Sequence, residues 1–159
     1  MSPAAKSALE ERCNPRSASR LAAVQALYEI EFGFGEPEVV ISEFIDRRLG
    51  AEVDGDRYAD ADPDFFRDVV RGGEGRSAEV DELMNEALGP ERTPQRLNGV
   101  LRALLRAATF ELLGRKDVPA RVVLDEYLDV AHAFFSGPET KLVNGVLDAL
   151  AHRLRPDEF

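Results

Sequence analysis

Apolar side chains recur at three- and four-residue steps along most of this sequence, the spacing that places them on one face of an α-helix. In the last part of the chain, apolar residues from Val143 to Leu154 fall at i, i+3, i+4, i+7 and i+11. The pattern predicts helices over residues 16–32, 37–49, 63–88, 98–114, 119–134 and a final one that reaches residue 154. No strand pattern of comparable strength occurs, so we expect an all-α fold.

Glycine, proline and capping residues set the expected helix ends. The glycines in 33–35 are expected to end the first helix. Three glycines in 72–75 each cost roughly 1 kcal/mol inside a helix, which predicts a kink or break there. Ser136, followed three residues later by Glu139, suggests a capping box before the last helix. Asn-Gly at 144–145 keeps the helical period, and we expect its glycine to let a neighbouring helix approach closely.

The charge of the chain is unevenly distributed. The chain has 159 residues, a formal net charge of -10, 44% hydrophobic residues and 31% charged residues. Residues 1–32 and 93–159 are each neutral, whereas residues 33–92 hold seventeen acidic and seven basic side chains. Screening confines each charged patch to about 10 Å at moderate salt, so the overall sign does not exclude a nucleic-acid partner.

The sequence offers little for catalysis or for a bound cofactor. His132 and His152 are the two histidines, and no His-Glu-x-x-His pair or Cys/His cluster could hold a metal. The glycine-rich stretches lack the lysine and Ser/Thr of a phosphate-binding loop. The polar N-terminus is not a secretory signal, and no apolar run approaches the ~18 residues of a membrane span. With Cys13 as the single cysteine, we expect a cytoplasmic, non-enzymatic protein without cofactor or metal.

Basic and aromatic residues provide the candidate binding chemistry. Arg12, Arg16 and Arg20 are spaced by four, so a helix extended over them would place three guanidinium groups on one face, toward successive phosphates. The alternative is three solvated arginines at a helix start, although cations there oppose the helix dipole. Tyr28 and Phe134 could stack on unpaired bases, although each taken singly fits a core position as well.

Four short motifs, in order, resemble those of the NusB family of transcription antitermination factors. They cover most of residues 16–150, and the acidic middle of the chain matches less well. The motifs are Arg-Ser-Ala-Ser-Arg-Leu-Ala-Ala-Val-Gln-Ala-Leu-Tyr at 16–28, Leu-Arg through Phe-Glu-Leu at 105–112, Asp-Val-Pro at 117–119 and Leu-Val-Asn-Gly-Val-Leu-Asp at 142–148.

The resemblance implies a fold and a set of partners. The fold would be two perpendicular three-helix bundles, near residues 16–88 and 93–155, after a disordered basic tail at 1–15. The expected ligand is the boxA element in leader RNA of ribosomal RNA operons. The expected protein partner is the small-subunit ribosomal protein that doubles as NusE, and the pair would join a complex that keeps RNA polymerase from terminating.

The resemblance also carries site residues over, one position at a time. Arg16 and Arg20 match the basic N-terminal segment, and Arg12 matches a basic position just before it. Tyr28, Phe134 and Lys141 match a tyrosine near the RNA, an aromatic of the second bundle and a basic residue before the Val-Asn-Gly motif. Leu142 stands where an aromatic is often found, and two serines interrupt the arginine run, so we expect modest RNA affinity that relies on the partner.

Two other functions compete with this interpretation. The first is the NusB-like appendage of a ribosomal RNA methyltransferase. We expect this alternative to be wrong, because the sequence leaves no room for a cofactor-binding α/β domain. The second is an interaction module that self-associates, as a homodimer for example, and binds RNA weakly or not at all. The acidic middle and the sparse arginines keep this second alternative open.

Overall fold

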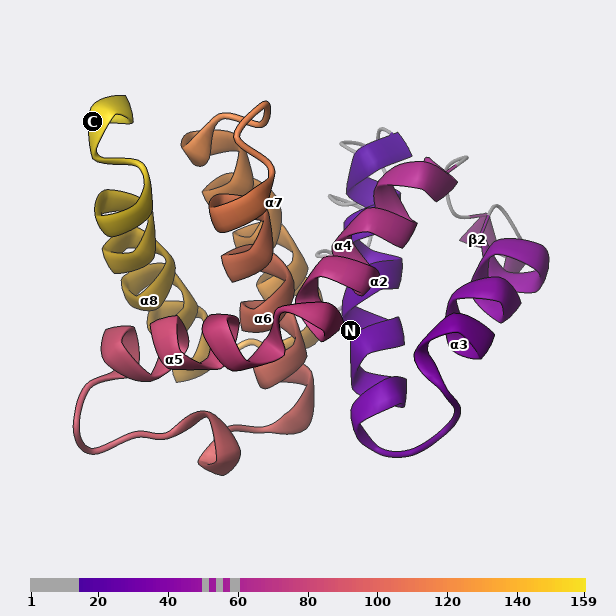
Figure 1. Cartoon of the computed structure of the whole chain (residues 1–159), viewed down its shortest axis with the longest axis horizontal. Coiled ribbons are helices and arrows are strands. Elements are labelled where there is room, and N and C mark those ends of the chain that lie inside the picture. The colour runs from indigo at the N-terminus through magenta and orange to yellow at the C-terminus, as the bar shows by residue number, and fades with distance from the viewer. Residues whose placement is uncertain (1–14, 50–51, 54–55, 58–60) are drawn as a thin grey trace.

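Helices form most of the structure, a computed structural model that describes residues 15–49, 52–53, 56–57 and 61–159 (Figure 1). The expectation of an all-α fold is confirmed, and the short antiparallel pair of β1 with β2 is a minor addition between helices. The predicted tail lies outside the described residues except for Pro15, which begins α2. The elements are α2 (Pro15–Glu31), α3 (Pro37–Glu43), the π-helical turn η1 (Phe44–Arg48), β1 (Glu52–Val53), β2 (Asp56–Arg57), α4 (Pro63–Gly75), α5 (Ser77–Leu88), η2 (Pro94–Arg96), α6 (Gly99–Gly114), α7 (Ala120–Phe134), α8 (Pro138–Leu154) and η3 (Pro156–Glu158).

Two three-helix bundles share one continuous apolar core. The first contains α2, α3 and α4, and the second contains α6, α7 and α8. Helix α2 lies at their junction, where it packs against α4, α6 and α7, and most of its residues are buried. Figure 1 shows α5 continuing from α4 toward α8. Since α5 packs against α6 and α8, the chain passes from one bundle to the other before residue 88.

The glycines near residue 72 have a packing role. Helix α4 continues through them to Gly75, and the predicted break follows at Arg76, between α4 and α5. A Cβ atom built on Gly72 would lie 2.1 Å from the ring of Phe110 in α6. The missing side chain therefore lets an aromatic ring of the second bundle lie directly against the backbone of α4.

The start of α8 corrects two sequence-based expectations. Helix α8 begins at Pro138, and no side chain caps it at Gly137, so the capping box of Ser136 and Glu139 does not form. Proline replaces the cap because its fixed φ suits the first helical turn and its missing N–H needs no acceptor. The expected close approach at Gly145 is also wrong, because a Cβ there would meet no atom within 4 Å.

Arg155 connects the C-terminal segment to the end of α6 through hydrogen bonds. Its buried guanidinium donates to the carbonyl oxygens of Leu112 at 2.7 Å and Val118 at 2.9 Å, and pairs with Glu158 at 2.8 Å. Glu158 also accepts a hydrogen bond from the backbone N–H of Ala120, the first residue of α7. One arginine thus satisfies carbonyls that the end of α6 would otherwise leave without partners.

The Glu158 carboxylate is expected to make the fold sensitive to acid. The hydrogen bond from the Ala120 N–H, followed by the one from Arg155, lowers the pKa of Glu158 below its usual 4.5. A lowered folded-state pKa stabilises the protein above the unfolded pKa, and this stabilisation disappears as pH falls through the folded value. In urea denaturation from pH 7 to pH 3, Glu158→Gln should therefore lose less stability than the wild type. Equal losses would contradict this role.

The described residues include no helix that is both long and apolar enough to cross a membrane.

Candidate functional site

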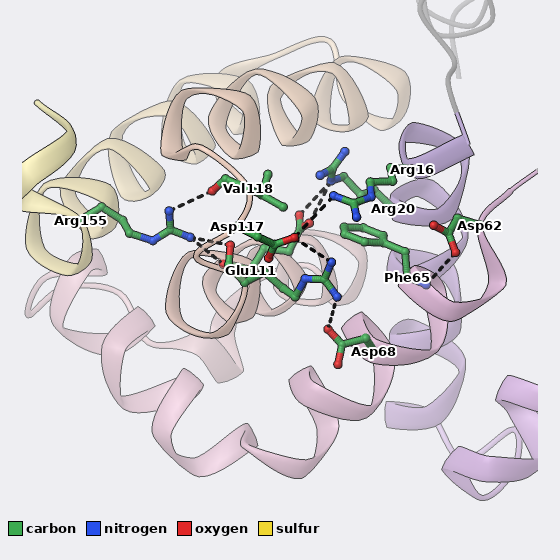
Figure 2. A network of polar contacts seen from close by, with 10 residues as sticks. Arg16, Arg20, Asp62, Phe65, Asp68, Glu111, Asp117, Val118 and Arg155 are labelled. Carbon is green, nitrogen blue, oxygen red and sulfur yellow. Dashed lines mark hydrogen bonds and ion pairs between the residues drawn. The ribbon is translucent and has the colours of Figure 1, made fainter.

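Arg20 is buried at the junction of the bundles rather than displayed on the surface. Its side chain is 2% exposed, and its Nε donates to the Glu111 carboxylate at 2.9 Å and 3.1 Å. Figure 2 shows Arg20 reaching from α2 toward Glu111 of α6. A second carboxylate, Glu126 of α7, lies 3.8 Å from the guanidinium. The prediction that Arg20 contacts RNA phosphates is therefore wrong for this structure, because its guanidinium is already held by buried carboxylates.

Arg20 and Glu111 each shift the pKa of the other. Burial lowers the pKa of Arg20, but the charge of Glu111 and its hydrogen bond outweigh burial and raise that pKa above its ordinary value. Burial raises the pKa of Glu111, and Arg20 opposes the rise. Tyr127 lies fully buried beside them, and burial followed by the negative charge of Glu111 raises the pKa of its hydroxyl well above its usual range. The group joins α2, α6 and α7.

Arg16 remains an accessible cation at the same end of α2. Its side chain is 44% exposed and lies 3.8 Å from Asp117, which also accepts a hydrogen bond from Arg115 at 3.1 Å. The Arg16 guanidinium lies 4.7 Å from the centre of the Phe65 ring. Three carboxylates, including Asp117 and Asp62, line the adjoining hollow of about 450 Å³, so that hollow does not favour an anion. Arg12 lies outside the described residues.

Tyr28 and Phe134, which are far apart in sequence, line the same hollow. It measures about 260 Å³ and lies where α2, η1, α6 and α7 meet, with Val24 and Val100 in its apolar wall. Both aromatic residues are half-buried and pack against the core, which also fits a structural role. An ion pair between Arg48 and Glu29, 2.9 Å apart, neutralises one side of the hollow. The hollow therefore offers mainly apolar and aromatic contacts.

Lys141 lines a third hollow, of about 400 Å³, between the end of α5 and the start of α8. Arg92, which the sequence analysis did not select, faces the same space. Both cations are exposed, and in the described part of the chain neither is held by a carboxylate. Leu142 and Gly145 complete the wall, so an apolar surface without an aromatic ring lies beside two free positive charges.

The predicted site residues therefore fall into two groups. Arg16 lies twelve residues before Tyr28 on the same helix, which separates them by about 18 Å along its axis. Tyr28 and Phe134 line one hollow near the ends of α2 and α7, and Lys141 lines another at the start of α8, whereas Arg16 and Arg20 lie beside the start of α7. No cluster of three or more His, Cys, Asp or Glu residues suitable for a metal occurs among the described residues.

Sequence comparison identifies close relatives over almost the whole chain. The model of the NusB family matches residues 17–152. The transcription antitermination protein NusB of Nitrobacter hamburgensis is 49% identical over 151 residues, which cover 95% of this chain and 94% of that protein. The protein of the same name from Maricaulis maris is 48% identical over 150 residues and covers 94% of both chains.

Solved structures share the fold. The structure of T. maritima NusB superposes with a TM-score of 0.75 at 31% identity, covering 91% of this chain and 96% of that chain. A second structure contains the antitermination factors NusB and NusE in complex with double-stranded RNA. It superposes with a TM-score of 0.71 at 20% identity over 86% of this chain and 96% of that chain, a likeness that concerns the fold alone.

Proposed function

Because the chain belongs to the NusB family, we propose that it is an antitermination factor that binds boxA RNA of ribosomal RNA operon leaders. It does so together with the NusE-type small-subunit ribosomal protein, within the complex that keeps RNA polymerase from terminating. The solved NusB structure that contains NusE and RNA supports both partners by analogy. In this role the protein binds RNA and its protein partner without catalysing a reaction, and it acts in the cytoplasm.

One observation carries the proposal for this chain. One hollow is lined by two aromatic side chains, and another by two cations that have no carboxylate partner among the described residues, from segments up to 113 residues apart in the sequence. Phe134 ends α7, and Lys141 lies in the first turns of α8, so the turn between these helices connects the aromatic hollow to the cationic one. Unpaired RNA bases stack on aromatic rings while cations contact the phosphates, which is the chemistry that these two hollows combine.

The proposed site residues contact different parts of the RNA. Tyr28 and Phe134 would contact bases, and Lys141 and Arg92 would contact phosphates. Arg16, about 18 Å away from Tyr28 along α2, faces the hollow lined by three carboxylates, so we assign it no phosphate contact. With Arg20 buried and Leu142 offering no ring, few contacts remain, so affinity should be modest without the protein partner.

The phosphate contacts can be tested by salt dependence. In fluorescence titrations of a boxA-type single strand, Lys141→Ala should weaken binding and reduce the slope of log K against log salt by about 0.7, the value for one lost phosphate contact. Arg92→Ala should act in the same way. Arg153→Ala removes a cation near the other end of α8, where it pairs with Glu86, and serves as the matched control. Unchanged affinity and slope in the Lys141 and Arg92 variants would contradict the proposed contacts.

The stacking contact can be separated from stability. Tyr28 packs on Phe32 with ring centres 4.7 Å apart, so Tyr28→Leu keeps apolar volume there but removes the ring surface. A lost stack weakens RNA binding by about 1–3 kcal/mol, which is roughly tenfold or more. The titration should show this loss while thermal denaturation shows a folded protein. Wild-type affinity in the folded variant would exclude a stacking role for Tyr28.

The burial of Arg20 favours one alternative function. With that cation withdrawn from the surface and a net charge of -10, the chain could serve as a self-associating interaction module with weak or no RNA binding. Titration of boxA-type RNA with and without the NusE-type protein separates the two functions. A gain in affinity with the partner that disappears at high salt supports the antitermination factor. No binding in either condition supports the module.

A further inference from the structure

The aromatic hollow, the one that Tyr28 and Phe134 line, also contains an ion pair. Nη1 of Arg48 donates to the two carboxylate oxygens of Glu29 at 2.9 Å and 3.0 Å. Glu29 is the one acid and Arg48 the one base among the residues that line this hollow. The pair therefore leaves the hollow neutral, and removal of the carboxylate alone would give it a positive charge.

A second contact, independent of Glu29, holds the Arg48 guanidinium in place. The guanidinium lies 3.8 Å from the centre of the Phe44 ring, close enough for a cation to be attracted to the face of an aromatic ring. Phe44 is buried and stacks on Phe66 with ring centres 5.5 Å apart, so its ring is anchored in the core. Arg48 should therefore keep its place beside the hollow when its carboxylate partner is removed.

Arg48 is the last residue of η1, a turn with the rare π-helical conformation. The N–H of Leu49 donates to the carbonyl of Phe44 at 2.8 Å, a step of five residues where an α-helix has a step of four. Single π-helical turns occur frequently at functional sites. The conformation of η1 is thus an observation, separate from the ion pair, that points to this turn as part of a binding site.

The ion pair is accessible to solvent and therefore opens at little cost. The side chain of Arg48 is 41% exposed and that of Glu29 is 31% exposed. Pairs of this kind contribute little to stability, because water and salt screen the charges. Arg20 differs, because buried carboxylates hold its guanidinium. Both hydrogen bonds to Glu29 come from one nitrogen of Arg48, and a guanidinium has five N–H donors, so an incoming anion can contact Arg48 before the carboxylate leaves.

We infer that Arg48 is a phosphate-binding residue of the aromatic hollow, and that Glu29 competes with RNA for Arg48 and so limits the RNA affinity of this chain. A guanidinium binds carboxylate and phosphate through the same charge-assisted hydrogen bonds, so Glu29 occupies the position that a phosphate would take. Proteins that bind single-stranded RNA combine cations along the backbone with rings on which the bases stack. The inference rests on the proposed function, because it requires that RNA bases stack on Tyr28 and Phe134.

Titration of a fluorescently labelled boxA-type single strand with the full chain, with and without the NusE-type protein, tests the inference. Glu29→Gln keeps the shape of the side chain but removes its charge, and it should raise RNA affinity roughly fivefold, as expected when an exposed ion pair no longer has to open. Arg48→Gln should lower affinity. In the Arg48→Gln background, Glu29→Gln should give little or no gain, because no cation is then released for the phosphate.

Glu79→Gln is the matched control for the loss of a carboxylate. Glu79 pairs with Arg76 at 3.0 Å, and both side chains are about half-exposed. Neither residue lines any of the three hollows described above. This variant releases an arginine in the same way but away from the proposed RNA site, so its RNA affinity should equal that of the wild type. Thermal denaturation should show that every variant is folded.

The outcomes separate this inference from the proposed function. Wild-type affinity in Glu29→Gln would show that the ion pair only joins η1 to α2. An equal gain from Glu29→Gln with and without Arg48, or from Glu79→Gln, would show a general effect of net charge. Each of these results overturns the inference and leaves the antitermination role intact. Absence of RNA binding by both the wild type and Glu29→Gln, even with the NusE-type protein, overturns the inference and the proposed function together.

Discussion

Replacing Arg20 with methionine is expected to lower the free energy of unfolding by about 3–5 kcal/mol, the usual effect of removing one member of a buried ion pair. Glu111, which Arg20 meets at 2.9 Å, would be left buried without that cation. Burial already raises the pKa of Glu111, and Arg20 is the main group that opposes the rise. The raised folded-state pKa favours the protonated protein, so the deficit should grow as pH rises above about 4.5. Urea denaturation at several pH values measures both effects.

Arg16→Met is the matched control for this experiment. Arg16 lies one turn earlier on the same helix, half-exposed and 3.8 Å from its carboxylate, so its loss should change stability by no more than about 0.5 kcal/mol. The double variant Arg20→Met with Glu111→Leu should recover much of the lost stability, because no buried charge then remains unpaired. If Arg20→Met were as mild as Arg16→Met, the structural role assigned to Arg20 would be wrong.

Gly72→Ala is expected to destabilise the protein by about 1–3 kcal/mol, although alanine is the better helix former. The added Cβ would lie 2.1 Å from the Phe110 ring, so the ring or the helix must move. Phe110 has little freedom to do so, because a Cβ on Gly114 would also lie 2.8 Å from its ring. Thermal and urea denaturation of the purified variant measure the loss.

The same substitution at Gly75 should have the opposite effect. Gly75 ends the same helix, and a Cβ there would meet no atom within 4 Å. Alanine should therefore stabilise the protein by up to about 1 kcal/mol through lower entropy of the unfolded chain. Two variants that differ only in position should thus change stability with opposite signs. Equal signs would show that the contact with Phe110 does not limit position 72.

Local patterns predicted the helices well because each pattern spans only a few turns. The apolar stripes located α2, α6 and α7 within one or two residues, and the glycine-rich stretch predicted the break that follows α4. The prediction for the start of α8 was wrong because two local signals competed there. Ser136 with Glu139 resembles a capping box, but Pro138 lies between them and begins the helix, which removes the need for a side-chain cap.

The candidate site was harder to predict because its members belong to distant segments. Their spacing in the sequence placed Arg16 and Arg20 on one helix face, yet in the structure the side chain of Arg20 is buried. A signal was available at Glu111, an acid within the apolar run of α6, which needs a cation partner if it is buried. No comparable signal distinguished Arg92 from other surface arginines, since only its position beside Lys141 makes it a candidate.

The sequence alone determined the all-α class, the positions of most helix ends and the excess of negative charge in the middle of the chain. Each of these depends only on residues that lie close together in the sequence. The tertiary structure decided which cations are free and which are held inside. That distinction depends on burial and on partners about 90 residues away, as for Arg20 and Glu111. It also decided that Tyr28 and Phe134 line one hollow, because packing between the bundles, and no local pattern, brings the ends of α2 and α7 together.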